Sequence, residues 1–154
     1  VDFNLPGRFD STFVGEDGTK HTPVLLHRAA LGSFERFIGI LLENYGGKLP
    51  VWLVPTQTVI AAITDEANDY AASINKKLLE SGIRSELDIR NEQISYKVRE
   101  HSLQKVPYII AVGKKEVENK SVSVRRLGSE KTESMLLNDF VKTVMKEAKT
   151  PLES

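Results

Sequence analysis

The sequence predicts an α/β protein with a mixed, largely parallel sheet flanked by about three helices. Short uninterrupted apolar runs, typical of strands buried on both faces, occur at residues 59–63 and 108–112. Between and after these runs, apolar side chains recur at helical spacing. Such alternation is characteristic of parallel strands joined by helices. The chain has no cysteine, which excludes disulfides and thiolate metal sites within it.

The first 48 residues predict two strands and one helix, which are too few elements to close a sheet. The strands are expected at 12–15 and 23–26, around a turn at 16–18. The helix is predicted from an apolar stripe formed by Phe34, Phe37, Ile38, Leu41, Leu42 and Tyr45. We therefore expect residues 1–48 to be part of a larger domain.

A glycine-rich connector at residues 46–50 precedes a second domain, predicted to span 49–149 and to be followed by a tail at 150–154. Its expected order is strand, helix, strand, helix, strand, strand, helix. The predicted strands are 59–63, 83–89, 108–112 and 121–126, the last two joined by a polar turn, and the predicted helices are 64–81, 93–104 and 137–145.

The remaining composition is that of an ordinary globular chain, with 40% hydrophobic and 27% charged residues. No apolar run approaches the roughly 18 residues that a membrane span needs, and Asp2, Asn4 and Arg8 interrupt any signal-peptide-like stretch. We therefore expect a cytoplasmic protein without a membrane partner. The chain begins with Val1 and has no methionine before Met135, which predicts a fragment of a longer protein.

The net charge of zero conceals a basic segment. Residues 91–126 carry eight basic and four acidic side chains, whereas the segments 1–50, 51–90 and 127–154 are each slightly acidic. A local basic face is what phosphate contacts require. Ordinary solvated lysines on helix surfaces would produce the same count, so charge alone does not decide between the two.

Four side chains in or beside this segment suit recognition of unpaired RNA bases. Asn91 offers an amide to a base edge, and Arg99 offers a planar fork to a base or phosphate. Arg125, which has Arg126 beside it at the end of a predicted strand, can stack on a base while Glu116 accepts from amino groups. Such contacts favour a single-stranded loop over duplex DNA. Salt bridges at strand ends are the alternative interpretation.

Two stretches resemble a known family. Residues 26–41 read LHRAALGSFERFIGIL, and this stretch is similar to the third conserved motif of class II aminoacyl-tRNA synthetases in its threonyl form, with His27 nine residues before Arg36. Residues 90–92, 97–100, 106–108, 113–118 and 122–125 resemble the anticodon-binding domain of the same family. The resemblance covers nearly the whole chain and identifies it as a member of the threonyl-tRNA synthetase family.

For residues 1–48, the resemblance implies the end of an antiparallel class II catalytic domain. It implies that Arg36 binds ATP, that Ser33 lies beside the threonine pocket, and that His27 is one of three zinc ligands. The other two ligands are expected outside this chain. The whole enzyme would use Zn²⁺, ATP and Mg²⁺ and form a homodimer, whereas the chain alone would bind no cofactor and charge no tRNA.

For the second domain, the resemblance implies that the partner is the anticodon loop of threonine tRNA. Glu116 and Arg125 would face the middle base, a guanine, and Asn91 and Arg99 would face the third base, a uracil. Two alternatives remain open at this point. One is the anticodon-binding part of a prolyl, histidyl or glycyl synthetase, and the other is a non-catalytic synthetase-like RNA-binding module.

Overall fold

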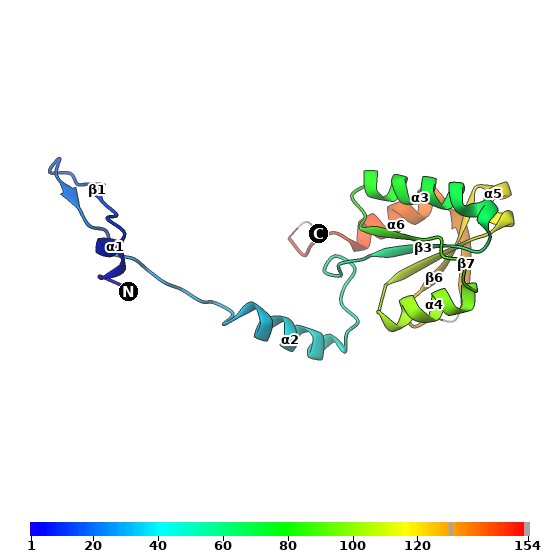
Figure 1. Cartoon of the computed structure of the whole chain (residues 1–154), viewed down its shortest axis with the longest axis horizontal. Helices are drawn as coiled ribbons and strands as arrows, with labels where there is room; N and C mark the ends of the chain where they lie inside the picture. The colour runs from blue at the N-terminus through cyan, green and yellow to red at the C-terminus, as the bar shows by residue number, and fades with distance from the viewer. Residues whose placement is uncertain (130, 153–154) are drawn as a thin grey trace. The chain divides into compact units, whose positions relative to one another are not determined.

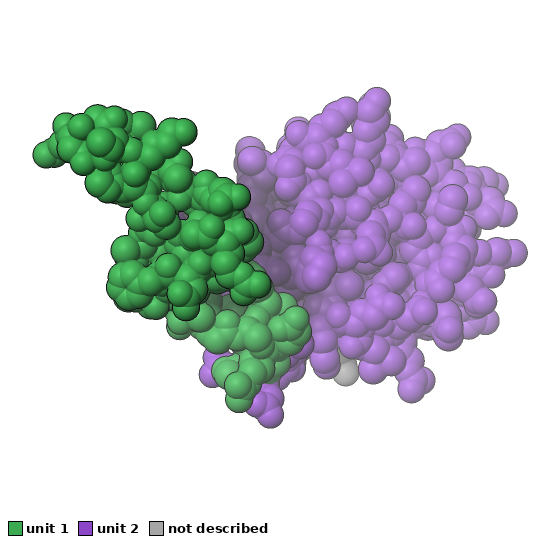
Figure 2. Space-filling view, turned by 60° about the vertical axis from the view of Figure 1, so that its left-hand side comes forward, with its two compact units in different colours: residues 1–41 green, residues 42–154 purple. Residues whose placement is uncertain are grey.

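The structure is a computed structural model that describes residues 1–129 and 131–152. It divides into two compact units, residues 1–41 and residues 42–154, which Figure 2 colours separately. Helix α2 (Phe34–Tyr45) begins in the first unit and ends in the second. The domain boundary predicted between residues 48 and 49 stays a prediction.

The first unit contains the short helix α1 (Leu5–Arg8) and a small antiparallel hairpin, β1 (Phe13–Val14) with β2 (Lys20–His21). The strand predicted at 23–26 is wrong, since only Leu25 in it pairs, through a single bridge to Asp2. Strand β2 ends at His21, and Pro23 has no backbone N–H with which to extend the strand pairing.

Helix α2 has no buried residue among its twelve. Phe34 is 81% exposed and Ile40 is 65% exposed, although the helix carries the apolar stripe expected from the sequence. A face of this kind normally packs against another element. The expectation that residues 1–48 belong to a larger domain stays a prediction.

The second unit is built on a five-stranded mixed sheet with the order β4-β3-β5-β6-β7 (Figure 1). The interior strand β3 pairs in parallel with β4 and β5, whereas β5, β6 and β7 pair antiparallel. All five residues of β3 are buried. The strands are β3 (Thr58–Ala62), β4 (Ser85–Asp88), β5 (Tyr108–Val112), β6 (Ser121–Arg126) and β7 (Thr132–Leu136).

Helices cover both faces of this sheet (Figure 1). On one face, α3 (Asn68–Glu80), entered through the 3₁₀ turn η1 (Asp65–Ala67), and α6 (Leu137–Glu147) enclose the apolar core. Strand side chains alternate between faces, so every second residue of β3, β5 and β6 enters that core. The core strand residues are Ile60, Ala62, Tyr108, Ile110, Val112, Val122 and Val124. On the opposite face, α4 (Ile94–Leu103) contacts β3 and β5.

The predicted α/β class is confirmed, with two local corrections. The polar turn expected between residues 112 and 121 contains a helix, α5 (Lys114–Asn119), and the strand β7 was not predicted. Strand β7 reads Thr-Glu-Ser-Met-Leu and is mostly exposed, so it lacks the apolar alternation that marks a strand in sequence. Pairing with β6 makes it a strand, and as a result half of the strand pairings are antiparallel.

Among the described residues, no helix is long and apolar enough to cross a membrane.

Candidate nucleic-acid interface

Helix α4 lies on one face of the sheet, over β3 and β5. On the same face, α4 does not cover the polar side chains of β6 and β7. Val122 and Val124 point into the core, so Ser123 and Arg125 lie on the opposite face. Ser123 is in register with Ser134, and Arg125 with Thr132. Because α4 lies over β3 and β5, this half of the sheet leaves Thr132 and Ser134 exposed and Arg125 partly exposed.

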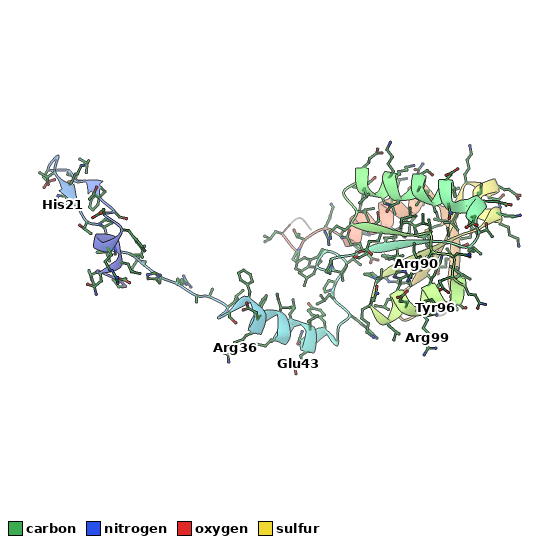
Figure 3. All side chains as sticks on the ribbon, viewed as in Figure 1. His21, Arg36, Glu43, Arg90, Tyr96 and Arg99 are labelled. Atoms are coloured by element: carbon green, nitrogen blue, oxygen red, sulfur yellow. The ribbon has the colours of Figure 1, made fainter. Side chains whose placement is uncertain are left out.

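A cavity of about 520 Å³ lies where α4 meets this surface. Its apolar side is formed by Ile94, Val98 and Leu103, and two arginines, Arg99 of α4 and Arg125 of β6, also line it. Figure 3 shows Arg99 extending from α4 away from the sheet. The cavity is completed by Ser95 and Ser102.

Neither of these guanidinium groups forms an ion pair within residues 1–129 and 131–152, in contrast to the neighbouring Arg126. Arg126 pairs with Glu147 at 2.9 Å and lies over the ring of Tyr108. The salt-bridge interpretation therefore applies to Arg126 and not to Arg125. Free planar cations beside an apolar cavity are suited to stacking on an unpaired base.

Glu116 lies near the same surface but is already hydrogen-bonded. Its carboxylate accepts from the backbone N–H of Gly113 at 2.9 Å and from Ser123 Oγ at 2.7 Å. Burial raises the pKa of Glu116, but the hydrogen bonds from Ser123, Gly113 and its own backbone N–H, together with the charge of Lys115, leave the pKa below its ordinary value. The group is thus a fixed, ionised acceptor beside Ser123 of β6.

Asn91 is exposed in the loop between β4 and α4 and is not part of the cavity lining. The structure therefore places Arg99 and Arg125 in the lining of one cavity, places Glu116 beside Ser123 of β6, and leaves Asn91 on a neighbouring loop.

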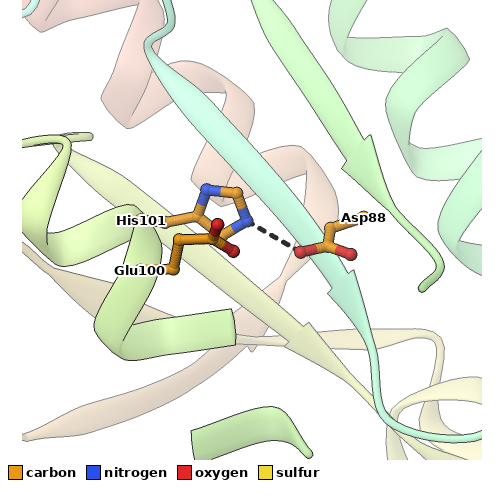
Figure 4. A group of neighbouring side chains, drawn as sticks. All are labelled: Asp88, Glu100 and His101. Carbon is orange, nitrogen blue, oxygen red and sulfur yellow. Dashed lines mark hydrogen bonds and ion pairs between the residues drawn. The ribbon is translucent and has the colours of Figure 1, made fainter. Parts of the chain in front are cut away.

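An ionic cluster missed in the sequence lies beneath this loop, centred on Asp88 at the end of β4. Arg90 donates from Nε to Asp88 Oδ1 at 3.0 Å and from its terminal nitrogen to Oδ2 at 2.7 Å. His101 Nε2 lies 2.8 Å from the same Oδ2 (Figure 4). Arg90 also pairs with Glu100 of α4.

Lys97 completes the cluster and is almost fully buried, at 1% exposure. Its ammonium group donates to the backbone oxygens of Ala62 at 2.8 Å and Asp88 at 3.3 Å, and lies 3.8 Å from the Asp88 carboxylate. It therefore joins α4 to the carboxyl ends of β3 and β4. A buried lysine needs such partners because an unpaired buried charge is strongly unfavourable.

This cluster is the one group in the described residues whose side chains could together ligate a metal, namely Asp88, Glu100 and His101. Arg90 already neutralises both carboxylates, so the group is an ion-pair network. The predicted zinc ligand His27 is not part of it. Its Nε2 lies 3.6 Å from an Asp2 oxygen, and these two side chains alone do not supply a tetrahedral zinc site.

The other two site residues predicted in the first part of the chain lie at the start of α2. Ser33 Oγ accepts the backbone N–H of Arg36 at 3.3 Å, as a helix-capping hydroxyl does. The Arg36 side chain is exposed on α2 (Figure 3).

We expect the ionic cluster around Asp88 to make the free energy of unfolding decrease at acidic pH. Hydrogen bonds from Arg90 lower the pKa of Asp88 far below the ordinary value of 3.8, against the effect of burial and with help from His101. The resulting stabilisation is complete above the unfolded-state pKa and is lost as the pH falls below it. Chemical denaturation at about pH 5 and pH 2.5 should therefore show a larger loss of unfolding free energy in the wild type than in Asp88→Asn. Equal losses would contradict the assignment.

The α/β fold carries two guanidinium groups, neither ion-paired among the described residues, at an apolar cavity, and this arrangement suits the binding of an unpaired RNA base. The sequence matches the family described as "Anticodon binding domain" over residues 57–147. It is 55% identical to the threonine–tRNA ligase of Parvibaculum lavamentivorans and 58% identical to that of Paracoccus denitrificans. These matches cover 98% and 97% of the chain, and 23% of each relative.

Solved structures show the same relationship. The RNA-binding domain of threonyl-tRNA synthetase from Cryptosporidium parvum Iowa II aligns with a TM-score of 0.72 and 32% identity, over 95% of this chain and 37% of that one. Prolyl-tRNA synthetase from Cryptosporidium parvum aligns with a TM-score of 0.65 but only 21% identity, over 94% and 31% of the two chains, and so shares the fold alone. The chain therefore belongs to the anticodon-binding domain family, in its threonyl-tRNA synthetase group.

Proposed function

We propose that residues 42–154 bind the anticodon loop of threonine tRNA. The observation that carries this proposal is that Arg99 and Arg125, which have no ion-pair partner among the described residues, line one cavity in a domain of the anticodon-binding family. A cavity of about 520 Å³ with an apolar side and polar ends suits a flat base with hydrogen-bonding edges. Duplex DNA has no unstacked base to enter it, so DNA is not the proposed partner.

Base identity is read by two pairs of side chains in this proposal. Arg125 stacks on the middle base of the anticodon, and Glu116 accepts from the N–H groups of its guanine edge. Asn91 and Arg99 read the third base, a uracil. The Glu116 carboxylate is held in place by Gly113 and Ser123, which supports this arrangement, because an ionised carboxylate accepts from guanine N–H groups and repels the acceptor edges of other bases.

The third anticodon base distinguishes the anticodons of threonine from those of proline. The anticodons of both amino acids have guanine in the middle, so Arg125 and Glu116 alone would not tell them apart. Uracil in the third position, against guanine in proline anticodons, leaves that distinction to Asn91 and Arg99. A histidyl or glycyl specificity would require a different middle base.

The whole protein is proposed to be an ATP-dependent threonine–tRNA ligase. The chain spans 23% of the length of the curated relatives it matches. In that enzyme Arg36 would hold ATP with Mg²⁺, Ser33 would lie beside the bound threonine, and His27 would ligate Zn²⁺ with residues outside this chain. The enzyme would act in the cytoplasm as a homodimer.

Binding and activation assays on the 154-residue chain test both parts of the proposal. Fluorescence anisotropy should show binding to a threonine anticodon stem-loop and weaker binding when the middle base is changed to adenine or the third base to guanine. Threonine-dependent pyrophosphate exchange should be absent. Equal binding to all three RNAs would refute the anticodon assignment, and exchange activity would refute the expectation that the chain alone is inactive.

A further inference from the structure

Arg90 joins β4 to α4, and the residues proposed to read the third base lie in the loop between these elements and in α4. Its guanidinium group binds the Asp88 carboxylate through two hydrogen bonds and also binds Glu100. Asp88 ends β4, whereas Glu100 lies in the last turns of α4. Arg90 therefore closes the loop between β4 and α4 from the inside.

The chain neighbours of this ion-pair network are the proposed base-reading residues. Asn91 directly follows Arg90, and Arg99 directly precedes Glu100. Asn91 is exposed, and the loop around it has little other support: Glu92 N–H donates to the Arg90 carbonyl at 2.8 Å, and Arg90 N–H donates to Asp88 at 3.2 Å. The position of Asn91 relative to Arg99 thus depends on the side-chain contacts of Arg90.

The Asp88 carboxylate, to which Arg90 binds, is buried and held by several partners. Asp88 is 5% exposed in its side chain and is held by His101 and Lys97 as well as by Arg90. Lys97 and His101 face inward from α4, one turn apart, and fix that helix to the sheet. Arg90 is 48% exposed, so it connects the buried Asp88 carboxylate to a solvent-facing loop.

We propose that Arg90 is a positioning residue for the third anticodon base. It acts through Asn91 and Arg99, while Nε and one terminal nitrogen of its own guanidinium group are bound to Asp88 and Glu100. The proposal rests on the proposed function, since it assumes that Asn91 and Arg99 read that base. It extends the recognition site to Arg90 and Glu100, a pair that does not touch the RNA.

Two substitutions with opposite charge changes separate positioning from direct electrostatic contact. Arg90→Ala removes a positive charge and Glu100→Gln removes a negative one, yet both break the same ion pair. We expect each to lower the preference for uracil over guanine at the third base by about fivefold, the size of coupling typical of residues in one network. The preference at the middle base should stay unchanged.

The exposed ion pair between Lys76 and Glu80 on α3 provides the matched control. Its Nζ and Oε1 atoms lie 3.9 Å apart. Lys76→Ala and Glu80→Gln make the same two charge changes outside the proposed interface and should leave both preferences unchanged. Thermal unfolding of all four variants checks that they remain folded. The measurements use the full 154-residue chain and three stem-loops that differ in one base.

The outcomes are distinct. If Arg90→Ala weakens binding to every RNA and Glu100→Gln strengthens it, Arg90 acts as a phosphate-binding cation and the positioning role is refuted. If both variants lose preference at the two bases equally, the network is merely structural. If the wild type does not distinguish third-base variants at all, the proposed function itself fails for that base. Loss confined to the third base in both variants supports the proposal.

Discussion

Replacing Arg125 with alanine is expected to weaken binding to the threonine anticodon stem-loop by about 1–3 kcal/mol, or roughly 5- to 150-fold. Arg125 lines the cavity between α4 and β6 and has no ion-pair partner in the described residues, so the substitution removes a stacking surface without leaving a carboxylate unpaired. The preference for guanine at the middle base should fall as well. Both quantities come from the same anisotropy titrations.

Lys114→Ala is the control for the loss of a positive charge. Lys114 lies on α5 and pairs with Glu66 at 2.9 Å on the surface. We expect it to weaken binding to all RNAs slightly and to reduce the salt dependence, with the base preference unchanged. An Arg125→Ala variant that retains the full preference for guanine would contradict the assigned role.

Replacing Lys97 with methionine is expected to destabilise the second unit by about 3–5 kcal/mol. The substitution keeps the apolar stem but removes the donor to the Ala62 and Asp88 carbonyls and one counter-charge of a nearly buried carboxylate. Asp88 retains Arg90 and His101, which places the expected cost toward the lower end of that range.

Urea denaturation followed by Trp52 fluorescence measures this cost. Trp52 is the one tryptophan in the chain and belongs to the second unit. Lys76→Met removes an exposed lysine from α3 and should change the unfolding free energy by less than about 0.5 kcal/mol. A Lys97→Met variant as stable as the wild type would show that the ion pairs and hydrogen bonds of Lys97 contribute no net stability.

Most of the second unit could be predicted from hydrophobic patterning. Residues 59–63 and 108–112 are continuous apolar runs because β3 and β5 are central strands buried on both faces. The errors lie where this signal is weak. Strand β7 has an exposed, polar composition, and α5 is only six residues long, so neither carries a periodicity that a sequence pattern can reveal.

The ion-pair network was missed for a related reason. In sequence, Lys97 and His101 read as polar positions on a helix, and Asp88 reads as the solvent face of an alternating strand. In the structure all three are buried. Residues this polar are mostly exposed, so only their mutual contacts, made between separate elements, indicate that they lie inside.

Periodicity and motif spacing are local properties of a chain, so the α/β class, the family and the residue types available for reading RNA follow from them without a structure. The tertiary structure decided which of these side chains meet. Arg125 lines the cavity with Arg99, whereas the adjacent Arg126 forms an ion pair with Glu147 on the other face of the sheet. That difference follows from the alternation of side chains along β6 and from the helices that cover each face. Neither the neighbours across a sheet nor the partner of a charge is encoded within a short stretch of sequence.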